Sequence, residues 1–300
     1  MKQLFFIFLS INVLCLNAQT NVDTIFSEIN FLASDELNGR ETGSEEALKS
    51  AEWIAEKFEE FGLKSPEWAT DYLQKFTLVK STILIQNLEL NQQQVNAEDF
   101  IALSSQTNFQ LNDVEAIKII RIGEKDDFMT QLSNASSSDS SVVVLINPYH
   151  SRHFKRIKQY LSRPKYILGD INKKFSIWIL SDQETIFEIK LQASNKIEEK
   201  KGYNVIGVLP GGKSEDHAWI YSAHYDHIGI IEPVNGDSIA NGANDDASGV
   251  VAIIELARRF SIEKTNEKPL WFIAFSAEEL GLFGSKYLAQ NIDINLIEGM

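Results

Sequence analysis

The sequence predicts an α/β fold in which helices flank a largely parallel mixed sheet. After residue 200, apolar β-prone runs alternate with amphipathic stretches in the order strand, strand, loop, helix, strand, loop, helix. A polar cluster adjoins each of the later apolar runs. Between residues 71 and 200, short β-like runs predict a strand-rich insert or lid. Open α/β sheets bind ligands at the carboxyl ends of their strands, so we expect the site along that edge of residues 201–300.

Residues 1–19 have the order of a signal peptide. One lysine precedes the apolar run LFFIFLSINVLCL, and the polar residues NAQ follow it. The run is too short for a confident membrane span. We therefore expect cleavage near Ala18 or Gln19 and export to the periplasm or the extracellular space. Cleavage there also removes Cys15, the only cysteine, so no disulfide is expected in the mature chain.

Residues 20–70 predict the N-terminal helical part of the main domain. Apolar positions recur at helical spacing in IFSEINFLASDELNG and in SEEALKSAEWIAEKFEEFGL, which stops at Gly62. Ser44 stands at the N-cap position of the second helix. The loop GRETGS, residues 39–44, joins the two helices, and its residues alone indicate a capped helical hairpin with no chemistry.

Residues 71–200 contain the runs expected to form the insert. The β-like runs are TLVKSTILI, EAIKIIRI, VVVLI, FSIWIL and FEIKLQA, and HFKRIKQYL predicts one basic helix with a solvated face. A serine-rich break is expected at Ser133–Ser141. His150 and His153 form an isolated H-x-x-H pair, which we expect to be a surface pair and not a metal site.

The net charge of −14 bears on the class of partner. A strongly acidic chain is repelled by nucleic acids and by anionic membranes, so we expect neither as a partner and no stable membrane association. The hydrophobic fraction of 44% in 300 residues is ample for a core.

His224 and Asp226 form the first polar cluster, directly after the run WIYSA. Residues two apart project from one face if the strand continues through them. A carboxylate beside a metal-binding imidazole accepts its second ring N–H and fixes the tautomer. For an H-x-D pair on its own, a solvated pair at a strand end is the commoner arrangement.

The second cluster, Asn244–Gly249, precedes the amphipathic helix VVAIIELARRF. Asp245 lies just outside the helix N-terminus, where the helix dipole favours an ionised carboxylate. Asp246 or Ser248 can cap the helix. Taken alone, such a cluster is more often explained by capping than by catalysis.

Glu278 and Glu279 form the third cluster, after the run LWFIAF. Gly281 and Gly284 follow at once, so we expect the glutamates on a turn and the next helix to begin near Ser285. Adjacent carboxylates can divide the work of binding a metal and moving protons. A solvated acidic turn is the alternative.

In this order, the three clusters resemble the zinc-dependent exopeptidases typified by the secreted bacterial leucyl aminopeptidase, to which glutaminyl cyclase is also related. The resemblance is carried by His224-x-Asp226, by GANDDASG at 242–249 and by FSAEELGLFGS at 275–285. It implies a three-layer sandwich, two zinc ions as cofactors, and hydrolysis of peptide bonds at the N-termini of peptides or proteins. The GRETGS turn is similar to the N-terminal region of the same family.

The resemblance also implies a role for each site residue. His224 binds one zinc ion, Glu279 binds the other, and Asp245 bridges both. Glu278 is the general base, and Asp226 orients His224. A cis peptide bond is implied after Asp245.

A two-zinc site with one bridging carboxylate needs about five protein ligands, of which these clusters supply three. In the family, the other carboxylate and histidine come later in the chain, so we expect them beyond Met300, and we expect the 300-residue chain, taken as C-terminally incomplete, not to be a competent peptidase. Glu298 precedes the position that the family uses. His217 lies a strand length from His224, and His227 is expected on the opposite face of the strand.

Two other functions stay open at this point. A glutaminyl cyclase-like zinc acyltransferase would use a related single-zinc site. A catalytically silent binding module of the same fold is the other alternative, although the presence of both Glu278 and Glu279 argues against it.

Overall fold

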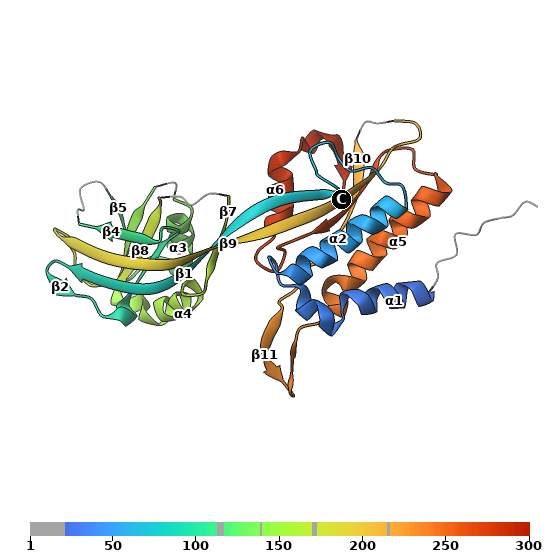
Figure 1. Cartoon of the computed structure of the whole chain (residues 1–300). Helices are drawn as coiled ribbons and strands as arrows, with labels where there is room; N and C mark the ends of the chain where they lie inside the picture. Colours follow the sequence, from blue (N-terminus) through green and yellow to red (C-terminus); the bar gives the residue numbers. More distant parts are fainter. Residues whose placement is uncertain (1–21, 113–116, 139, 170–172, 215–216) are drawn as a thin grey trace, which may run out of the picture.

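The computed structural model describes residues 22–112, 117–138, 140–169, 173–214 and 217–300. The predicted signal peptide lies outside these residues. The chain forms two lobes joined by a ribbon of two long strands, β1 (Leu73–Leu90) and β9 (Ile189–Leu209) (Figure 1). We call the lobe with both the N-terminal helices and the C-terminal strands the site lobe, and the other the distal lobe.

The sheet of the site lobe is built around β10 (Ala218–His224). This strand pairs in parallel with β13 (Leu270–Phe275) on one side and with β14 (Ile297–Gly299) on the other. β9 pairs antiparallel with the far edge of β13. The predicted mixed sheet is thus confirmed, with its parallel part centred on β10.

Helices cover both faces of this sheet because the side chains of β13 alternate between them. Phe272 and Ala274 pack in one cluster with α1 (Val22–Leu32), α2 (Glu45–Glu60) and α5 (Ser248–Glu263). Ile273 and Phe275 pack with Leu288 of α6 (Phe283–Asn291) on the opposite face. Full burial of such side chains contributes roughly 1.5–3 kcal/mol each. The predicted helix-flanked α/β class is confirmed.

The predicted helices form where the apolar spacing and caps place them. The Ser44 Oγ accepts the N–H of Ala47 at 3.0 Å and caps α2. In α5, one stripe is buried against the sheet: Val250, Val251, Ile253, Ile254 and Ala257. Each helix therefore follows from an amphipathic stripe with a defined beginning.

The ribbon pairs antiparallel along its whole length, from Leu73 with Val205 to Leu90 with Ile189. One end of the ribbon belongs to the site lobe, where β9 meets β13. The other end packs against the distal lobe through Leu88, Leu90 and Leu191. The two strands therefore run through both lobes, and β9 crosses the expected boundary at residue 200.

The distal lobe holds a second sheet in the order β3 (Phe100–Ser104), β8 (Phe175–Leu180), β6 (Val142–Ile146) and β5 (Lys118–Ile122). β6 is fully buried and pairs in parallel with both of its neighbours. One face packs on the ribbon, and the other packs on α3 (Phe128–Ser136) and α4 (Ser151–Leu161).

The expected serine-rich break is partly wrong, because α3 extends through Ser136. Asp127 caps this helix by accepting the N–H of Thr130 at 2.8 Å. Phe128 and Ala135 are buried on its inner side. The polar composition of this segment did not indicate a helix, because only Phe128 and Ala135, two turns apart, are buried on it.

The remaining elements are short. They are β2 (Gln93–Gln94), β4 (Asn108–Leu111), β7 (Lys165–Leu168), β11 (Ile230–Val234), β12 (Asp237–Ile239), the 3₁₀ turns η1 (Asp35–Arg40), η2 (Ala97–Asp99), η3 (Pro148–His150) and η5 (Ile294–Leu296), and the π-helical turn η4 (Ala243–Ala247). Among the helices described, none has the length and apolar character needed to cross a membrane.

Candidate metal centre

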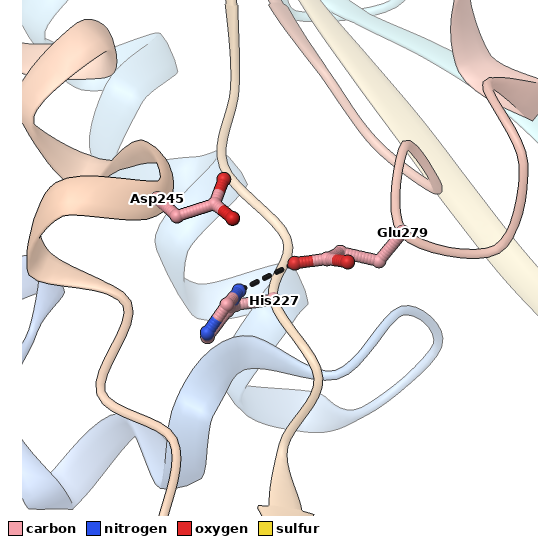
Figure 2. Close-up of side chains that lie close together, drawn as sticks. All are labelled: His227, Asp245 and Glu279. Carbon is pink, nitrogen blue, oxygen red and sulfur yellow. Dashed lines mark hydrogen bonds and ion pairs between the residues drawn. The ribbon is translucent and has the colours of Figure 1, made fainter.

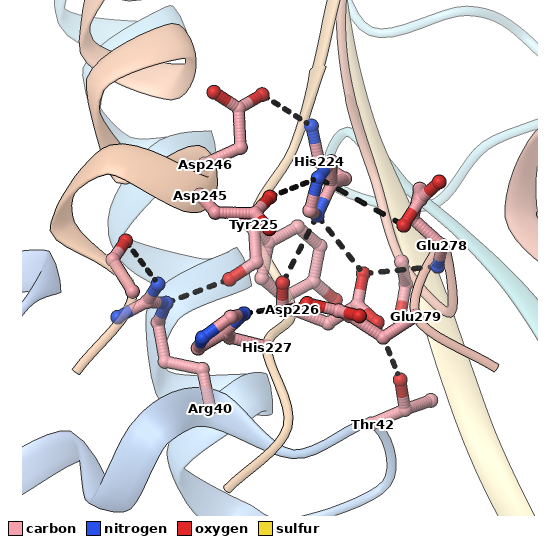
Figure 3. Close-up of polar contacts among 12 residues, drawn as sticks. Arg40, Thr42, His224, Tyr225, Asp226, His227, Asp245, Asp246, Glu278 and Glu279 are labelled. Carbon is pink, nitrogen blue, oxygen red and sulfur yellow. Dashed lines mark hydrogen bonds and ion pairs between the residues drawn. The ribbon is translucent and has the colours of Figure 1, made fainter. Parts of the chain in front are cut away.

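Three loops meet at the carboxyl edge of the site-lobe sheet. In the parallel pair β10 and β13, His224 lies opposite Phe275, so both strands end at the same level. The loop after β13 therefore comes beside the loop after β10. The π-helical turn η4, which leads into α5, closes the third side (Figure 3).

His224 is the last residue of β10 and lies at the centre of these loops. Its Nε2 is 3.1 Å from Asp245 Oδ1 and 3.9 Å from Glu278 Oε2. Its Nδ1 is 3.1 Å from the main-chain oxygen of Asp226. A carbonyl oxygen only accepts, so Nδ1 carries the proton and the lone pair of a neutral His224 lies on Nε2, facing Asp245.

Burial disfavours the charged form of His224, but neighbouring oxygens outweigh it. The main-chain oxygen and carboxylate of Asp226 favour the charged form, as do the carboxylates of Glu278 and Asp246. The net result is a raised pKa for His224. The surroundings of this imidazole are therefore those of a cation-binding position.

Asp226 is fully buried behind His224. Because β10 ends at His224, the expected placement on one strand face does not arise, and the carboxylate lies 4.0 Å from His224 Nδ1. One carboxylate oxygen accepts from Thr42 Oγ1 at 2.8 Å and the other from the N–H of Glu278 at 3.1 Å. Burial raises the pKa of Asp226 despite these hydrogen bonds.

Asp245 and Asp246 are adjacent but have different surroundings. The Asp245 side chain is 64% exposed and turns toward His224. Asp246 Oδ1 accepts the N–H of Gly249 at 3.0 Å, and Oδ2 accepts that of His224 at 3.3 Å. Asp246 is therefore the cap, as one of the two alternatives expected, and the bond between the two aspartates is cis.

Gly242 lets this turn approach the histidines. Its φ of +62° lies in the left-handed region, and a Cβ there would come within 2.7 Å of His227 Cδ2 and 2.8 Å of Arg40 Nη2. Any other residue at this position would push the turn that carries Asp245 away from the site.

Glu278 and Glu279 lie on the tight turn after β13, where the Gly281 N–H donates to the Glu278 main-chain oxygen at 2.8 Å. The two side chains face different histidines. Glu278 faces His224, whereas Glu279 Oε1 lies 2.5 Å from Nδ1 of His227 (Figure 2). The two predicted glutamates thus occupy separate positions in the site.

His227 was expected on the opposite face of a continuing strand, and that expectation is wrong. The chain leaves the strand at His224, so the alternation of faces no longer applies at residue 227. His227, Asp245 and Glu279 each offer a donor atom, and these atoms lie within 4.8 Å of one another. The signal available in the sequence was the second histidine of H-Y-D-H, but the end of the strand could not be read there.

A cavity of about 280 Å³ lies beside His224 and Glu278. Ala223, Phe275 and Leu282 form its apolar wall. The carboxylate of Glu278 therefore lies beside the histidine and also borders an apolar recess.

The other residues considered from the sequence lie away from the site. Glu298 pairs with Lys268 at 2.6 Å, and His217 precedes the opposite end of β10. His150 is buried, which corrects the expected surface pair, and its Nε2 lies 2.8 Å from the main-chain oxygen of Gly123. His153 is exposed on α4.

The donor set fits zinc. Zinc is bound by imidazole nitrogen and carboxylate oxygen at about 2.0–2.2 Å, and catalytic sites commonly combine histidines with one carboxylate. Asp245 lies between His224 on one side and the pair formed by His227 and Glu279 on the other. A shared carboxylate between two such groups is an arrangement that can hold two ions.

Sequence comparison identifies the same region of the chain. Residues 204–299 match the model of Peptidase family M28. A probable zinc metalloprotease of Pyricularia oryzae is 40% identical over 100 residues, which are 32% of this chain and 19% of the relative. Leucine aminopeptidase 1 of Sclerotinia sclerotiorum is 31% identical over 152 residues, which are 45% of this chain and 37% of the relative. The chain thus spans less than half the length of either relative.

The fold is also found in a solved structure. The aminopeptidase from Aneurinibacillus sp. strain AM-1 superposes with a TM-score of 0.50 at 20% identity, covering 94% of this chain and 69% of that chain. Identity at this level shows the fold alone. Residues 204–299 are therefore similar to Peptidase family M28, and they lie within an α/β fold that this chain shares with a bacterial aminopeptidase.

Proposed function

We propose that this protein is a zinc-dependent aminopeptidase that hydrolyses peptide bonds at the N-termini of peptides or proteins. The observation that carries the proposal is the convergence of His224, Asp245, Glu278 and Glu279 at one sheet edge, with Asp245 shared between two groups of donors. The name of the Pyricularia oryzae relative and that of the Aneurinibacillus protein support the two parts of this assignment, zinc and aminopeptidase.

Three residues hold the two ions in this proposal, as the family resemblance implies. His224 would hold one ion, Glu279 would hold the other, and Asp245 would be shared between them. His227 adds an imidazole beside Glu279, at the second position. When bound, the zinc pair supplies an acidified water and polarises the carbonyl of the scissile bond.

Glu278 serves as general base. Its carboxylate lies next to the Nε2 side of His224 and borders the cavity, so it can reach both a water at the metal centre and a substrate. Glu278 takes the proton of the attacking water and delivers it to the nitrogen of the leaving group. Asp226 holds the ring of His224 from behind through its main-chain oxygen.

We also propose that residues 1–19 direct export of the protein to the periplasm or the extracellular space. The support is the order of charge, apolar run and polar residues at the N-terminus. Mass spectrometry of exported protein should find an N-terminus near Gln19 or Thr20. An exported, folded product that retains Met1 would refute this proposal.

The experiment for the main proposal uses paired substrates on the 300-residue chain and on a chain extended through the two further ligands that the family resemblance implies, and activity is expected in the extended chain. An aminoacyl anilide with a free α-amine is compared with its N-acetylated form, before and after removal of metal by a chelator and after addition of zinc. The proposal expects zinc-dependent hydrolysis of the free amine only. Hydrolysis that survives chelation, or zinc-dependent formation of pyroglutamate in place of hydrolysis, would contradict it.

A further inference from the structure

The GRETGS turn, residues 39–44, runs from the end of η1 to the start of α2 and lies across the loops of the metal centre, although none of its residues is a proposed ligand. The guanidinium of Arg40 is fully buried and donates to main-chain oxygens of separate segments. Nε donates to Tyr225 at 2.7 Å, Nη1 to Asn241 at 2.8 Å, and Nη2 to Gly242 at 3.1 Å (Figure 3). Nη1 also donates to Leu32 at the end of α1. One side chain thus ties the loop after β10 to the turn that carries Asp245.

Main-chain contacts of the same turn reinforce this link. The N–H of His227 donates to the Arg40 oxygen at 3.2 Å, and that of Gly229 donates to the Gly39 oxygen at 3.2 Å. Gly39 has a φ of +69°, and a Cβ there would meet the main-chain oxygen of Ala240 at 2.5 Å. The turn therefore packs between the loop after β10 and the loop that leads to Asp245, and position 39 has no room for a residue larger than glycine.

Thr42 extends the link to the third loop. Its hydroxyl donates to Asp226 Oδ2 at 2.8 Å, while Asp226 Oδ1 accepts the N–H of Glu278 at 3.1 Å. The main-chain oxygen of Asp226 accepts from His224 Nδ1. The hydroxyl of Thr42 thus fixes the carboxylate of Asp226, which in turn holds the turn that carries Glu278. The main chain of the same aspartate holds the ring of His224.

The chemistry of Arg40 argues that this arrangement does more than join two helices. A guanidinium buried away from water is costly unless its donors are satisfied, and burial lowers the pKa of Arg40 to about 10. The apolar core between α1, α2 and α5 already packs these helices through Leu32, Ile54 and Ile254. Apart from the bond to Leu32 at the end of α1, the bonds of Arg40 go to loop oxygens of Tyr225, Asn241 and Gly242, which helix packing does not need.

We propose that Arg40 and Thr42 are positioning residues of the metal centre, with Arg40 setting the spacing of the His224 and Asp245 loops and Thr42 setting the orientation of Asp226. This inference rests on the proposed function, because it gives the residues a role toward the metal. It predicts that substitutions at Arg40 and Thr42 change the affinity for the metal and the geometry of its site more than they change the stability of the protein.

The test compares four variants of the full chain: Thr42→Val, Thr42→Ser, Arg40→Lys and Ser44→Ala. Thr42→Val keeps the shape and removes the hydroxyl, whereas Thr42→Ser keeps the hydroxyl. Ser44→Ala removes the cap of α2 from the same turn without touching the loops, and so controls for stability. Zinc affinity is measured by competition with a chromophoric chelator, cobalt geometry by visible absorption, and stability by melting of the metal-free protein.

We expect Thr42→Val to weaken metal binding about 10- to 100-fold and to alter the cobalt spectrum, as loss of an outer-shell partner does. Thr42→Ser should restore most of the affinity, and Arg40→Lys should lose at least as much as Thr42→Val. Ser44→Ala should lower the melting temperature and leave affinity and spectrum unchanged. Unchanged binding in Thr42→Val, or an equal loss in Ser44→Ala, would overturn the proposal.

Amide hydrogen exchange of the metal-free protein separates this proposal from the proposed function. If the wild-type protein binds no zinc, the proposed function fails by itself. Arg40→Lys and Thr42→Val should still speed exchange in residues 224–229 and 241–246 relative to Ser44→Ala. Equal exchange in all variants would show that the turn does not hold these loops.

Discussion

The two lobes place parallel strands in similar settings but use the strand ends differently. In the site lobe, β10 ends in His224 and β13 leads into Glu278 and Glu279. Glu278 faces His224, and Glu279 faces His227 in the loop after β10. In the distal lobe, the ends of β5 and β6 are followed by Gly123 and Asn147. In the distal lobe, the polar side chains accept hydrogen bonds from main-chain N–H groups of the same turns.

The distal turns show this use of polar groups directly. Asn147 Oδ1 accepts the N–H of Tyr149 at 2.9 Å, and Asp126 Oδ2 accepts that of Gly123 at 2.7 Å. The ring of His150 lies on the main-chain oxygen of Gly123. These groups satisfy the backbone where the strands end, so they are not available to a ligand.

The two lobes are not distinguished by the size of their cavities, but they are distinguished by the side chains that line them. The distal lobe holds a cavity of about 360 Å³, larger than the one of about 280 Å³ beside His224. Among the described residues that line the distal cavity, none is a histidine, cysteine or carboxylate. A candidate site is therefore better identified by donors that converge than by volume.

Glu278→Gln is the substitution with the largest expected effect. The amide keeps the shape of the side chain but cannot accept the proton of the attacking water, so turnover should fall by about 10²- to 10⁴-fold. Zinc content should stay near that of the wild type. Glu298→Gln, outside the site, is the control, and near wild-type turnover in Glu278→Gln would remove the general-base assignment.

Replacing histidines in the two lobes tests the contrast between them. His224→Ala should weaken binding of the tightest zinc ion by more than about 100-fold, since it removes a ligand and not merely an outer-shell partner. His153→Ala, on the surface of the distal lobe, should leave zinc binding unchanged. Calorimetric titration measures both, and a loss only in His153→Ala would move the site to the distal lobe.

His227→Ala is expected to act on the second ion. Loss of the imidazole beside Glu279 should weaken binding of the second zinc ion by about 10- to 100-fold, while the ion at His224 stays bound. His217→Ala removes a histidine at the other end of β10 and serves as the matched control. Two ions bound with unchanged affinities in His227→Ala would exclude a role for His227 in metal binding.

Glu28 provides a smaller test, because burial raises its pKa although it lies on α1, away from the metal centre. A raised carboxyl pKa means that the contribution of Glu28 to stability is fully present below its unfolded pKa and is lost as the pH rises through its folded pKa. Glu28→Gln should therefore raise the free energy of unfolding at pH 7 by about 1 kcal/mol or less, with the gain disappearing near pH 4. The melting temperature should rise accordingly at pH 7.

The pair of Glu28 with Lys57 at 3.4 Å opposes this gain and keeps it small. Glu56→Gln, exposed on α2, is the control. Aminopeptidase turnover should be the same in both variants. A large loss of turnover in Glu28→Gln would show that this carboxylate is coupled to the site.

The sequence predicted the elements whose pattern is local. The stripe of α5, the cap of α2 and the polar ends of β10 and β13 depend on neighbouring residues, and the structure has them where expected. The meeting of the three clusters followed from the rule for strand ends together with the family resemblance.

What the sequence did not predict depends on contacts between distant segments. β1 and β9 form one continuous ribbon because they pair with each other, yet each contains polar stretches that break the apparent strand pattern. The face of His227 depends on where β10 ends, and the burial of Arg40 depends on carbonyls up to 202 residues away along the chain. Such features are determined by tertiary packing and not by local propensity.

The position of bound zinc tests the account most directly. Crystals of the full chain grown with zinc, with data collected at the zinc absorption edge, locate the ions without reference to activity. We expect an ion about 2.0–2.2 Å from His224 Nε2 and from a carboxylate oxygen of Asp245, and a second ion between Asp245 and Glu279. Zinc bound at His150 and His153, or ordered zinc found only away from Asp245, would contradict the assignment of the metal centre to the site lobe.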